Sequence, residues 1–239
     1  MAVVTTKAIV LSALKYGDTS LIVKCFTAQE GLKTYLIRGV LSSKKGNLKA
    51  GYFQVLNQLN IVGNHNSKGN LNSLKEAHIL NPYKTIYSDI VKQSIVLFLA
   101  EVLSNCIQEE EKNESLYNFL EGGLLWLDTE EKIVNFHLLF LLNLTQYLGF
   151  YPNISDEKIG FDLVEGEFSF STSSKNIIYG EDLNQFKKLL NRNFQDLENI
   201  FFSKNQRQQA LQIILKYYKL HLDGFRNPKS LAILETVFS

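Results

Sequence analysis

The chain has 239 residues, of which 45% are hydrophobic, a composition typical of a folded, soluble protein with one large core or two modest ones. Its net charge of +1 excludes a uniformly basic or acidic protein. The two cysteines, Cys25 and Cys106, lie far apart and next to no histidine, which argues against a disulfide framework and a cysteine-based metal site and fits a reducing cytoplasm.

The first 80 residues contain short runs in which apolar and polar residues alternate, as in half-buried strands. Turn signals separate these runs, which span residues 5–14, 19–26, 32–40 and 52–62, with a fifth that ends near Leu80. In the fourth run, alternation puts Phe53 and Ile61 on one face and Gln54 and Asn60 on the other. Five strands in so short a stretch predict a small closed or nearly closed barrel, and such barrels include the oligonucleotide-binding (OB) fold.

From residue 81 the apolar period becomes helical. Asn81, followed by proline, predicts the start of a first helix. The run "IVLFLAEVL" is apolar almost all round and predicts a central bundle helix. Asp128 and Glu131 have capping-box spacing ahead of another helix, which Gly149 is placed to end.

Later signals complete the helical part. Ser203 and Gln206 have the same capping-box spacing ahead of an amphipathic run, and Asn227, followed by proline, precedes a last short helix. Between these helices, "FDLVEGEFSFS" predicts a hairpin that turns at Glu165 and Gly166. We therefore expect an α+β protein with a barrel over residues 1–80 and a helical domain over residues 81–239.

Signals for catalysis are weak. The chain lacks the glycine-rich phosphate loop of nucleotide hydrolases, and Ser42 and Lys45 have the S-x-x-K spacing of penicillin-binding enzymes without that family's other motifs. His137, in an apolar helix, and His221, near a helix end, are most simply structural residues. Glu101 resembles a buried functional acid, but an interhelical hydrogen bond or a position at the edge of the core explains it more simply. We expect no enzymatic activity and no cofactor.

Charge divides the chain sharply. Residues 1–80 contain ten basic and three acidic residues, a net charge of +7, whereas residues 81–180 have a net charge of −9 and residues 181–239 one of +3. No aspartate or glutamate occurs between Gly31 and Lys75. Lysines on a loop often serve only solubility, but a surface of one sign attracts polyanions. The first module is therefore a candidate nucleic-acid-binding domain.

A turn-prone stretch, "RGVLSSKKGNLKAGY", is the centre of this basic region. Its glycines and serines would let the backbone approach phosphates, and neighbouring aromatic residues could pack or stack on bases. Of these, Phe53 is expected in the core, while Tyr35 and Tyr52 could serve either purpose. The predicted DNA-binding residues are Lys15, Lys33, Arg38, Lys44, Lys45, Lys49 and Lys68.

Both ends of the chain resemble the RecO family of bacterial recombination mediators. The segment "AIVLSALKYGDTSLIVKCFTAQEGLKTYLIRGVLSSKK" is similar to that family's opening pattern of two strands, a Tyr-Gly-acid turn, a glycine turn and a basic loop after Gly39. The segment "LKYYKLHLDGFRNPKSL" resembles its closing pattern, in which His221-Leu222 precedes Lys229-Ser230-Leu231. The resemblance covers essentially the whole chain.

The resemblance implies an OB-fold barrel joined to an all-helical domain, with a small zinc-finger-like hairpin insertion, here residues 151–178. Many members bind zinc there through four cysteines, but the stretch "YPNISDEKIGFDLVEGEFSFSTSS" contains neither cysteine nor histidine. We therefore expect a degenerate hairpin without zinc ligands, held instead by Phe161, Phe168 and Phe170.

The resemblance also implies a non-enzymatic role in DNA repair. It predicts binding of single- and double-stranded DNA, annealing of complementary strands, and action with RecR to load RecA onto DNA covered by single-stranded DNA-binding protein. The acidic, apolar-ended tail of that protein would bind the helical domain beside Lys84, Lys92 or Lys132, or those lysines are plain helix surface. The alternative function is a scaffold whose OB fold binds acidic peptide tails without direct work on DNA.

The expected location is the bacterial cytoplasm, near the nucleoid. The opening "MAVVTTKAIVLSAL" lacks a basic segment followed by an apolar one, so it predicts a strand and no export signal. The longest apolar tract, "IVNFHLLFLLNLTQYLGF", is interrupted by Asn135, His137 and Gln146 and is too polar for a membrane span. No membrane contact is expected.

Overall fold

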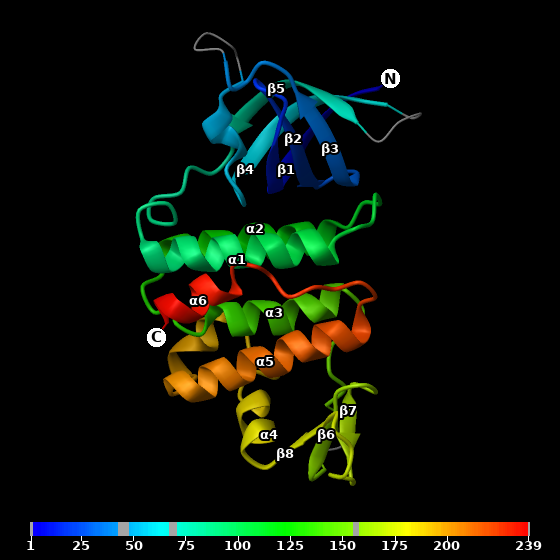
Figure 1. The fold of residues 1–239 in the computed structure, drawn as a ribbon, viewed down its shortest axis with the longest axis vertical. Helices are drawn as coiled ribbons and strands as arrows, with labels where there is room; N and C mark the ends of the chain where they lie inside the picture. Colours follow the sequence, from blue (N-terminus) through cyan, green and yellow to red (C-terminus); the bar gives the residue numbers. More distant parts are fainter. Residues whose placement is uncertain (1, 43–47, 67–70, 155–157, 239) are drawn as a thin grey trace. The chain divides into compact units, whose positions relative to one another are not determined.

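A computed structural model of the chain describes residues 2–42, 48–66, 71–154 and 158–238, which form two compact units, Met1–Asp128 and Thr129–Ser239. Figure 1 shows a barrel followed by helices in the first unit and helices with a small sheet in the second. None of the helices in the described ranges has the length and apolar content needed to cross a bilayer.

The barrel is closed by five strands, as the sequence predicts. These are β1 (Ala2–Tyr16), β2 (Ser20–Thr27), β3 (Gly31–Ile37), β4 (Gln58–His65) and β5 (Asn72–Ile79). Their order around the barrel is β1-β2-β3-β5-β4, and the only parallel neighbours among these described strands are β3 and β5. Alternate side chains, including Val23, Tyr35 and Ile61, fill the interior and are almost fully buried.

The fourth predicted strand begins later than the alternation suggests. Ala50–Phe53 form a short 3₁₀ helix, η1, and β4 starts at Gln58. Leu56 has a positive φ of 61°, which breaks an extended run, and its carbonyl oxygen accepts a 2.8 Å hydrogen bond from the Tyr83 hydroxyl. Phe53 is buried as predicted, but it enters the core from η1 instead of from a strand.

The first helix also begins later than predicted. Helix α1 (Ile90–Cys106) is capped by Asp89, whose side chain accepts hydrogen bonds from the amides of Val91 and Lys92. Asn81 instead donates its side-chain amide to the Gln58 side chain at 2.5 Å. Helix α2 (Glu114–Thr129) follows, so Asp128 lies inside a helix and does not cap the next one.

The second unit is built from helices and one small sheet. Its elements are α3 (Phe136–Tyr147), β6 (Gly160–Asp162), β7 (Glu167–Ser169), β8 (Ile177–Tyr179), α4 (Gly180–Lys187), η2 (Phe194–Asn199), α5 (Lys204–His221) and α6 (Leu231–Val237). The capping box of Ser203 and Gln206 is confirmed at the start of α5, and Gly149, with a φ of 86°, follows α3 as predicted. The last helix starts three residues after Pro228.

The predicted hairpin is confirmed as β6 and β7, which turn at Gly166, where φ is 71°. Strand β8 pairs with the other edge of β6 and completes the order β7-β6-β8. Phe161 and Phe168 lie opposite each other and are buried. The expectation for Phe170 is wrong, because this side chain is 78% exposed and does not support the hairpin.

Candidate nucleic-acid interface

The outward-facing side chains of β1, β2 and β3 form one continuous surface, here called the outer barrel face. Strand register puts Leu14, Ile22 and Leu36 directly opposite one another, and Ser12, Lys24 and Thr34 in the next row. The residues between these rows, such as Val23 and Tyr35, point into the core. The outer barrel face consists of Ser12, Leu14, Tyr16, Ser20, Ile22, Lys24, Thr34 and Leu36, with Arg38 just beyond β3.

This face is basic. Lys24 is exposed near its centre, Arg38 is exposed at one edge, and Lys15 is exposed at the end of β1. One acid, Asp18, lies in the adjoining β1–β2 turn. The predicted set omits Lys24, although its polar position in the alternating run "TSLIVKCF" is the signal that would have identified it. The strands of such barrels and the adjoining loops are where OB folds bind oligonucleotides.

The basic loop leaves β3 beside the β1–β2 turn, since the Leu41 amide donates to the Thr19 carbonyl at 2.9 Å. The loop therefore begins next to the outer barrel face. Lys44, Lys45 and Lys68 lie outside the described residues, so their predicted contacts with DNA stay predictions.

Two other predicted DNA-binding lysines have partners of their own. The Lys33 side chain is only 16% exposed, and its ammonium forms a 3.2 Å ion pair with Glu110. Lys49 precedes η1, and its ammonium lies 5.9 Å from the ring centroid of Tyr52. Among the aromatic residues considered for stacking, Tyr35 and Phe53 are buried in the core.

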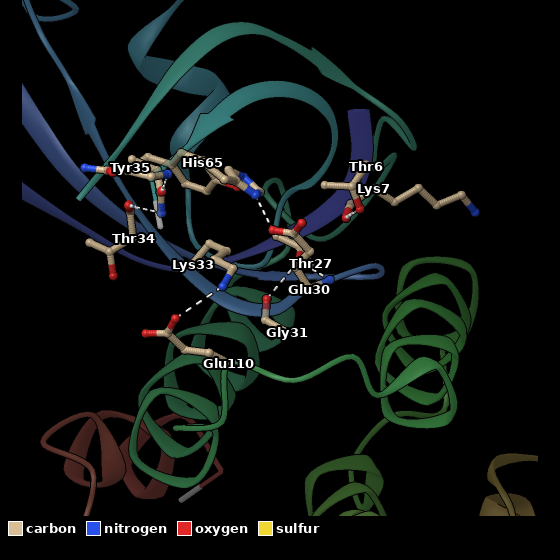
Figure 2. A network of polar contacts seen from close by, with 12 residues as sticks. Thr6, Lys7, Thr27, Glu30, Gly31, Lys33, Thr34, Tyr35, His65 and Glu110 are labelled. Atoms are coloured by element: carbon tan, nitrogen blue, oxygen red, sulfur yellow. Dashed lines mark hydrogen bonds and ion pairs between the residues drawn. The ribbon is translucent and has the colours of Figure 1, made fainter. Parts of the chain in front are cut away.

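A polar network fixes the barrel end where β4 stops (Figure 2). The Nδ1 of His65 contacts the Glu30 carboxylate, and its Nε2 lies 2.8 Å from the Tyr35 hydroxyl. An ionised carboxylate can only accept, so Nδ1 carries a proton, and in the neutral ring Nε2 then accepts from the Tyr35 hydroxyl. Burial raises the pKa of Tyr35, which keeps its hydroxyl protonated as that donor. Tyr35 is fully buried, so this network links the barrel core to the β2–β3 turn and the end of β4.

The same end of the barrel holds the start and end of the β4–β5 connection. The Asn72 side chain accepts from the Asn66 amide at 3.0 Å and donates to the Thr34 carbonyl at 3.1 Å. His65 and Asn72 thus tie the base of this connection to β3 and to the β2–β3 turn. The connection between strands 4 and 5 is one of the places where OB folds bind nucleic acid.

The β2–β3 turn is itself held against the segment after α1. Gly31 has a φ of 64°, and a Cβ at this position would lie 2.3 Å from the Glu111 carbonyl oxygen. The Leu32 amide donates to the Glu109 carbonyl at 3.0 Å. Only glycine permits both this conformation and this close approach.

In the second unit, an open pocket of about 410 Å³ lies beside Lys132. Its apolar lining comes from Val134, Leu197, Ile200, Phe201 and Phe202, and its acids are Glu131 and Glu198. Lys132 forms a 3.4 Å ion pair with Glu198, and both side chains are exposed, so solvent screens this pair and leaves Lys132 free to exchange partners. The pocket thus has largely apolar walls with Lys132 among its lining residues, and a role in peptide binding stays a prediction.

The other two lysines of the predicted tail site differ from Lys132. Lys92 is 4% exposed, and its ammonium donates to the Thr85 hydroxyl at 2.7 Å and the Asp128 carbonyl at 3.0 Å. Buried and bonded in this way, Lys92 has no surface to offer a peptide, and we withdraw it from the site. Lys84 is exposed, but it belongs to the first compact unit, whereas Lys132 belongs to the second.

Both cysteines and His137 are largely buried. Burial raises the pKa of the Cys25 thiol to about 12 and also raises that of Cys106, so neither thiol ionises readily. Burial lowers the pKa of His137 to about 3, as expected for a neutral core histidine. Within the described ranges, no group of three or more histidine, cysteine or acidic side chains could hold a metal ion.

A closed barrel in the strand order β1-β2-β3-β5-β4, followed by helices, puts the chain in the class of OB-fold proteins with a helical region. The family described as Recombination protein O N terminal matches residues 1–83, and the family described as Recombination protein O C terminal matches residues 87–232. The chain belongs to the RecO family of DNA repair proteins.

Similar proteins support this assignment over the full length. The chain is 48% identical over 238 residues to the DNA repair protein RecO of Flavobacterium psychrophilum, with 99% of each chain covered. It is 46% identical over 234 residues to that of Christiangramia forsetii and 35% identical over 238 residues to that of Bacteroides fragilis, with 98% of each chain covered in both comparisons.

Proposed function

We propose that this chain is a non-enzymatic recombination mediator that binds single- and double-stranded DNA through the basic residues of the outer barrel face and the adjoining basic loop. The observation that supports this proposal most is the exposed pair Lys24 and Arg38 on that face, in a family of DNA repair proteins. The absence of acids between Gly31 and Lys75 also supports the proposal, because a surface of one sign attracts polyanions.

The same positive charge would also promote the annealing of complementary DNA strands. Two DNA strands repel each other through their phosphates, and a protein that neutralises both backbones lets complementary bases meet without any fuel. We propose that the chain anneals complementary strands in this way in the bacterial cytoplasm, near the nucleoid. We further propose that it acts with RecR to load RecA onto DNA covered by single-stranded DNA-binding protein, as the resemblance implies.

The double variant Lys24→Glu with Arg38→Glu is expected to weaken DNA binding at least tenfold at low salt. Each lost phosphate contact also makes the slope of log affinity against log salt shallower by roughly 0.7 to 0.9. Fluorescence anisotropy with labelled oligonucleotides over a salt series measures both effects. The same series with Lys44→Glu and Lys45→Glu tests the basic loop.

The matched control is Lys204→Glu with Lys219→Glu, which changes the net charge equally at two exposed positions of α5. It should bind DNA nearly as the wild type does. If the barrel variant and this control lose the same affinity, net charge alone governs binding and the outer barrel face is not the site.

For the acidic tail of single-stranded DNA-binding protein, we propose the pocket beside Lys132. The pocket's apolar walls suit the apolar end of such a tail, and Lys132 would exchange Glu198 for the terminal carboxylate. Two further cations are near these walls, because Lys188 donates to the Phe201 carbonyl at 3.4 Å and Arg207 donates to the Asn135 side chain at 3.2 Å. They would offset the repulsion from Glu131 and Glu198.

Lys132→Glu is expected to weaken binding of a tail peptide roughly tenfold, since a hydrogen bond to a charged group contributes about 1.5–3 kcal/mol. Phe201→Ala should also weaken it, and because Phe201 is 76% exposed this variant should fold normally. Titration calorimetry measures the affinity of each variant for the peptide, with Lys219→Glu as the control. Unchanged affinity in both pocket variants would put the tail elsewhere, for instance near Lys216.

The second candidate function is an OB-fold scaffold that binds acidic peptides through the same basic face. DNA and peptide binding differ in their salt dependence, because a duplex or single strand releases many condensed counterions and a short peptide releases few. Tight binding of acidic peptides by the outer barrel face, without binding of oligonucleotides, would favour the scaffold.

A further inference from the structure

The outer barrel face carries an apolar row that phosphate binding does not use. Leu14, Ile22 and Leu36 lie opposite one another across three strands, and Leu14 is 64% exposed. Tyr16 comes two residues after Leu14 on the same face and is 57% exposed. The barrel core lies on the other side of the sheet, so the exposed parts of these side chains are not needed to fill it.

We propose that this row contacts the bases of single-stranded DNA, that Tyr16 stacks on one base, and that the face therefore prefers single strands to duplex. The inference rests on the proposed DNA binding and adds the part of the ligand that the row recognises. In a duplex the bases are stacked and paired inside the helix, whereas a single strand can turn them outward onto an apolar surface.

The charges on either side of the apolar row indicate which ligand it binds. Lys24 lies one row from Ile22, a distance of about 7 Å along a strand. Arg38 follows β3 on the side of the row where Tyr16 lies, and the Leu41 amide binds the Thr19 carbonyl in the β1–β2 turn. Apolar side chains between cations match bases between phosphates, whereas an uncharged apolar protein surface would not complement these cations.

Tyr16 is the described aromatic residue of the barrel best placed for stacking. Tyr35 and Phe53 are buried, and Tyr52 is partly buried with the Lys49 ammonium near its ring. A tyrosine ring offers a flat apolar face to any base, so the contact would be tolerant of sequence.

Abasic DNA separates base contacts from phosphate contacts. Anisotropy at one salt concentration would compare an oligo-dT of about 12 nucleotides, an abasic oligomer of the same length and a duplex of the same length. The wild type should bind oligo-dT at least about fivefold more tightly than the abasic oligomer, because stacking is worth about 1–3 kcal/mol per base. Tyr16→Ala should lose most of this difference and leave the affinity for the abasic oligomer and the duplex unchanged.

Three variants make the test specific. Tyr16→Phe keeps the ring and should behave as the wild type does, and Leu14→Gln should reduce the oligo-dT preference on its own. Tyr179→Ala removes a tyrosine of nearly equal exposure, 56%, in the second unit and should change nothing.

Equal binding of oligo-dT and the abasic oligomer by the wild type would overturn the inference and leave the proposed function standing. An equal loss for both ligands in Tyr16→Ala would overturn it too, because the ring would then serve phosphates or folding. A wild type that binds none of the three ligands would overturn the proposed function itself, and this inference with it.

Discussion

Replacing Asp128 with alanine is expected to lower the free energy of unfolding by about 3 kcal/mol or more at neutral pH. The Asp128 carboxylate is 5% exposed and accepts hydrogen bonds from the backbone amides of Lys84, Thr85 and Ile86 at 2.8–3.0 Å. Without it, these amides lose their acceptor, and a buried donor left unpaired costs about 1–3 kcal/mol. Urea unfolding at pH 7 measures the loss.

The loss should depend on pH in one direction. Burial alone would raise the pKa of the Asp128 carboxyl, but hydrogen bonds from the amides of Lys84, Thr85 and Ile86 lower it by more, so its pKa lies below the usual value. The stabilisation is therefore complete above the unfolded pKa of about 3.9 and is lost as the pH falls through the lower folded pKa. The difference between wild type and Asp128→Asn should accordingly shrink in strong acid.

Asp89→Ala is the control, because Asp89 also accepts two backbone amides but does so at the exposed start of α1. Loss of such a cap costs about 1 kcal/mol. If Asp128→Ala and Asp89→Ala unfold at the same urea concentration, the buried hydrogen bonds contribute no more than an ordinary helix cap.

The local parts of the fold could be predicted from the sequence. Alternating runs gave the five strands of the barrel, and the turn at Gly166 and the capping box at Ser203 were located correctly because each depends on a few neighbouring residues. Errors arose where a distant partner decides. Asn81 and Asp128 both have the residue type of a helix cap, but Gln58 binds the first and the Lys84–Ile86 backbone binds the second.

For the candidate site, the sequence predicted a basic module but not the geometry within it. Lys33 and Lys92 look like surface lysines in the sequence, yet Glu110 pairs with the first and Thr85 and Asp128 surround the second. Which side chains share a face of the barrel depends on strand register. Here the register puts the basic Lys24 and the aromatic Tyr16 on the outer barrel face. Lys44, Lys45 and Lys68 lie outside the described residues, so the structure tests none of them.

The small sheet of the second unit is held by aromatic packing. Phe161 is fully buried, with ring centroids 5.4 Å from Phe168, 5.2 Å from Phe186 and 6.3 Å from Tyr217. This cluster joins β6 and β7 to α4 and α5. Tyr217 also donates its hydroxyl to the Phe150 carbonyl at 2.8 Å, which fixes the ring in this cluster.

Phe161→Ala is therefore expected to destabilise the second unit by about 3–5 kcal/mol, the cost of emptying a fully packed aromatic site. Phe170→Ala, in the same hairpin, should change stability by less than about 0.5 kcal/mol because this ring is 78% exposed. Thermal unfolding followed by near-ultraviolet circular dichroism measures both, and a chelator should leave the wild-type midpoint unchanged. A midpoint that falls in the chelator, or about one zinc per purified chain, would mean that a metal holds the hairpin in place of the phenylalanines.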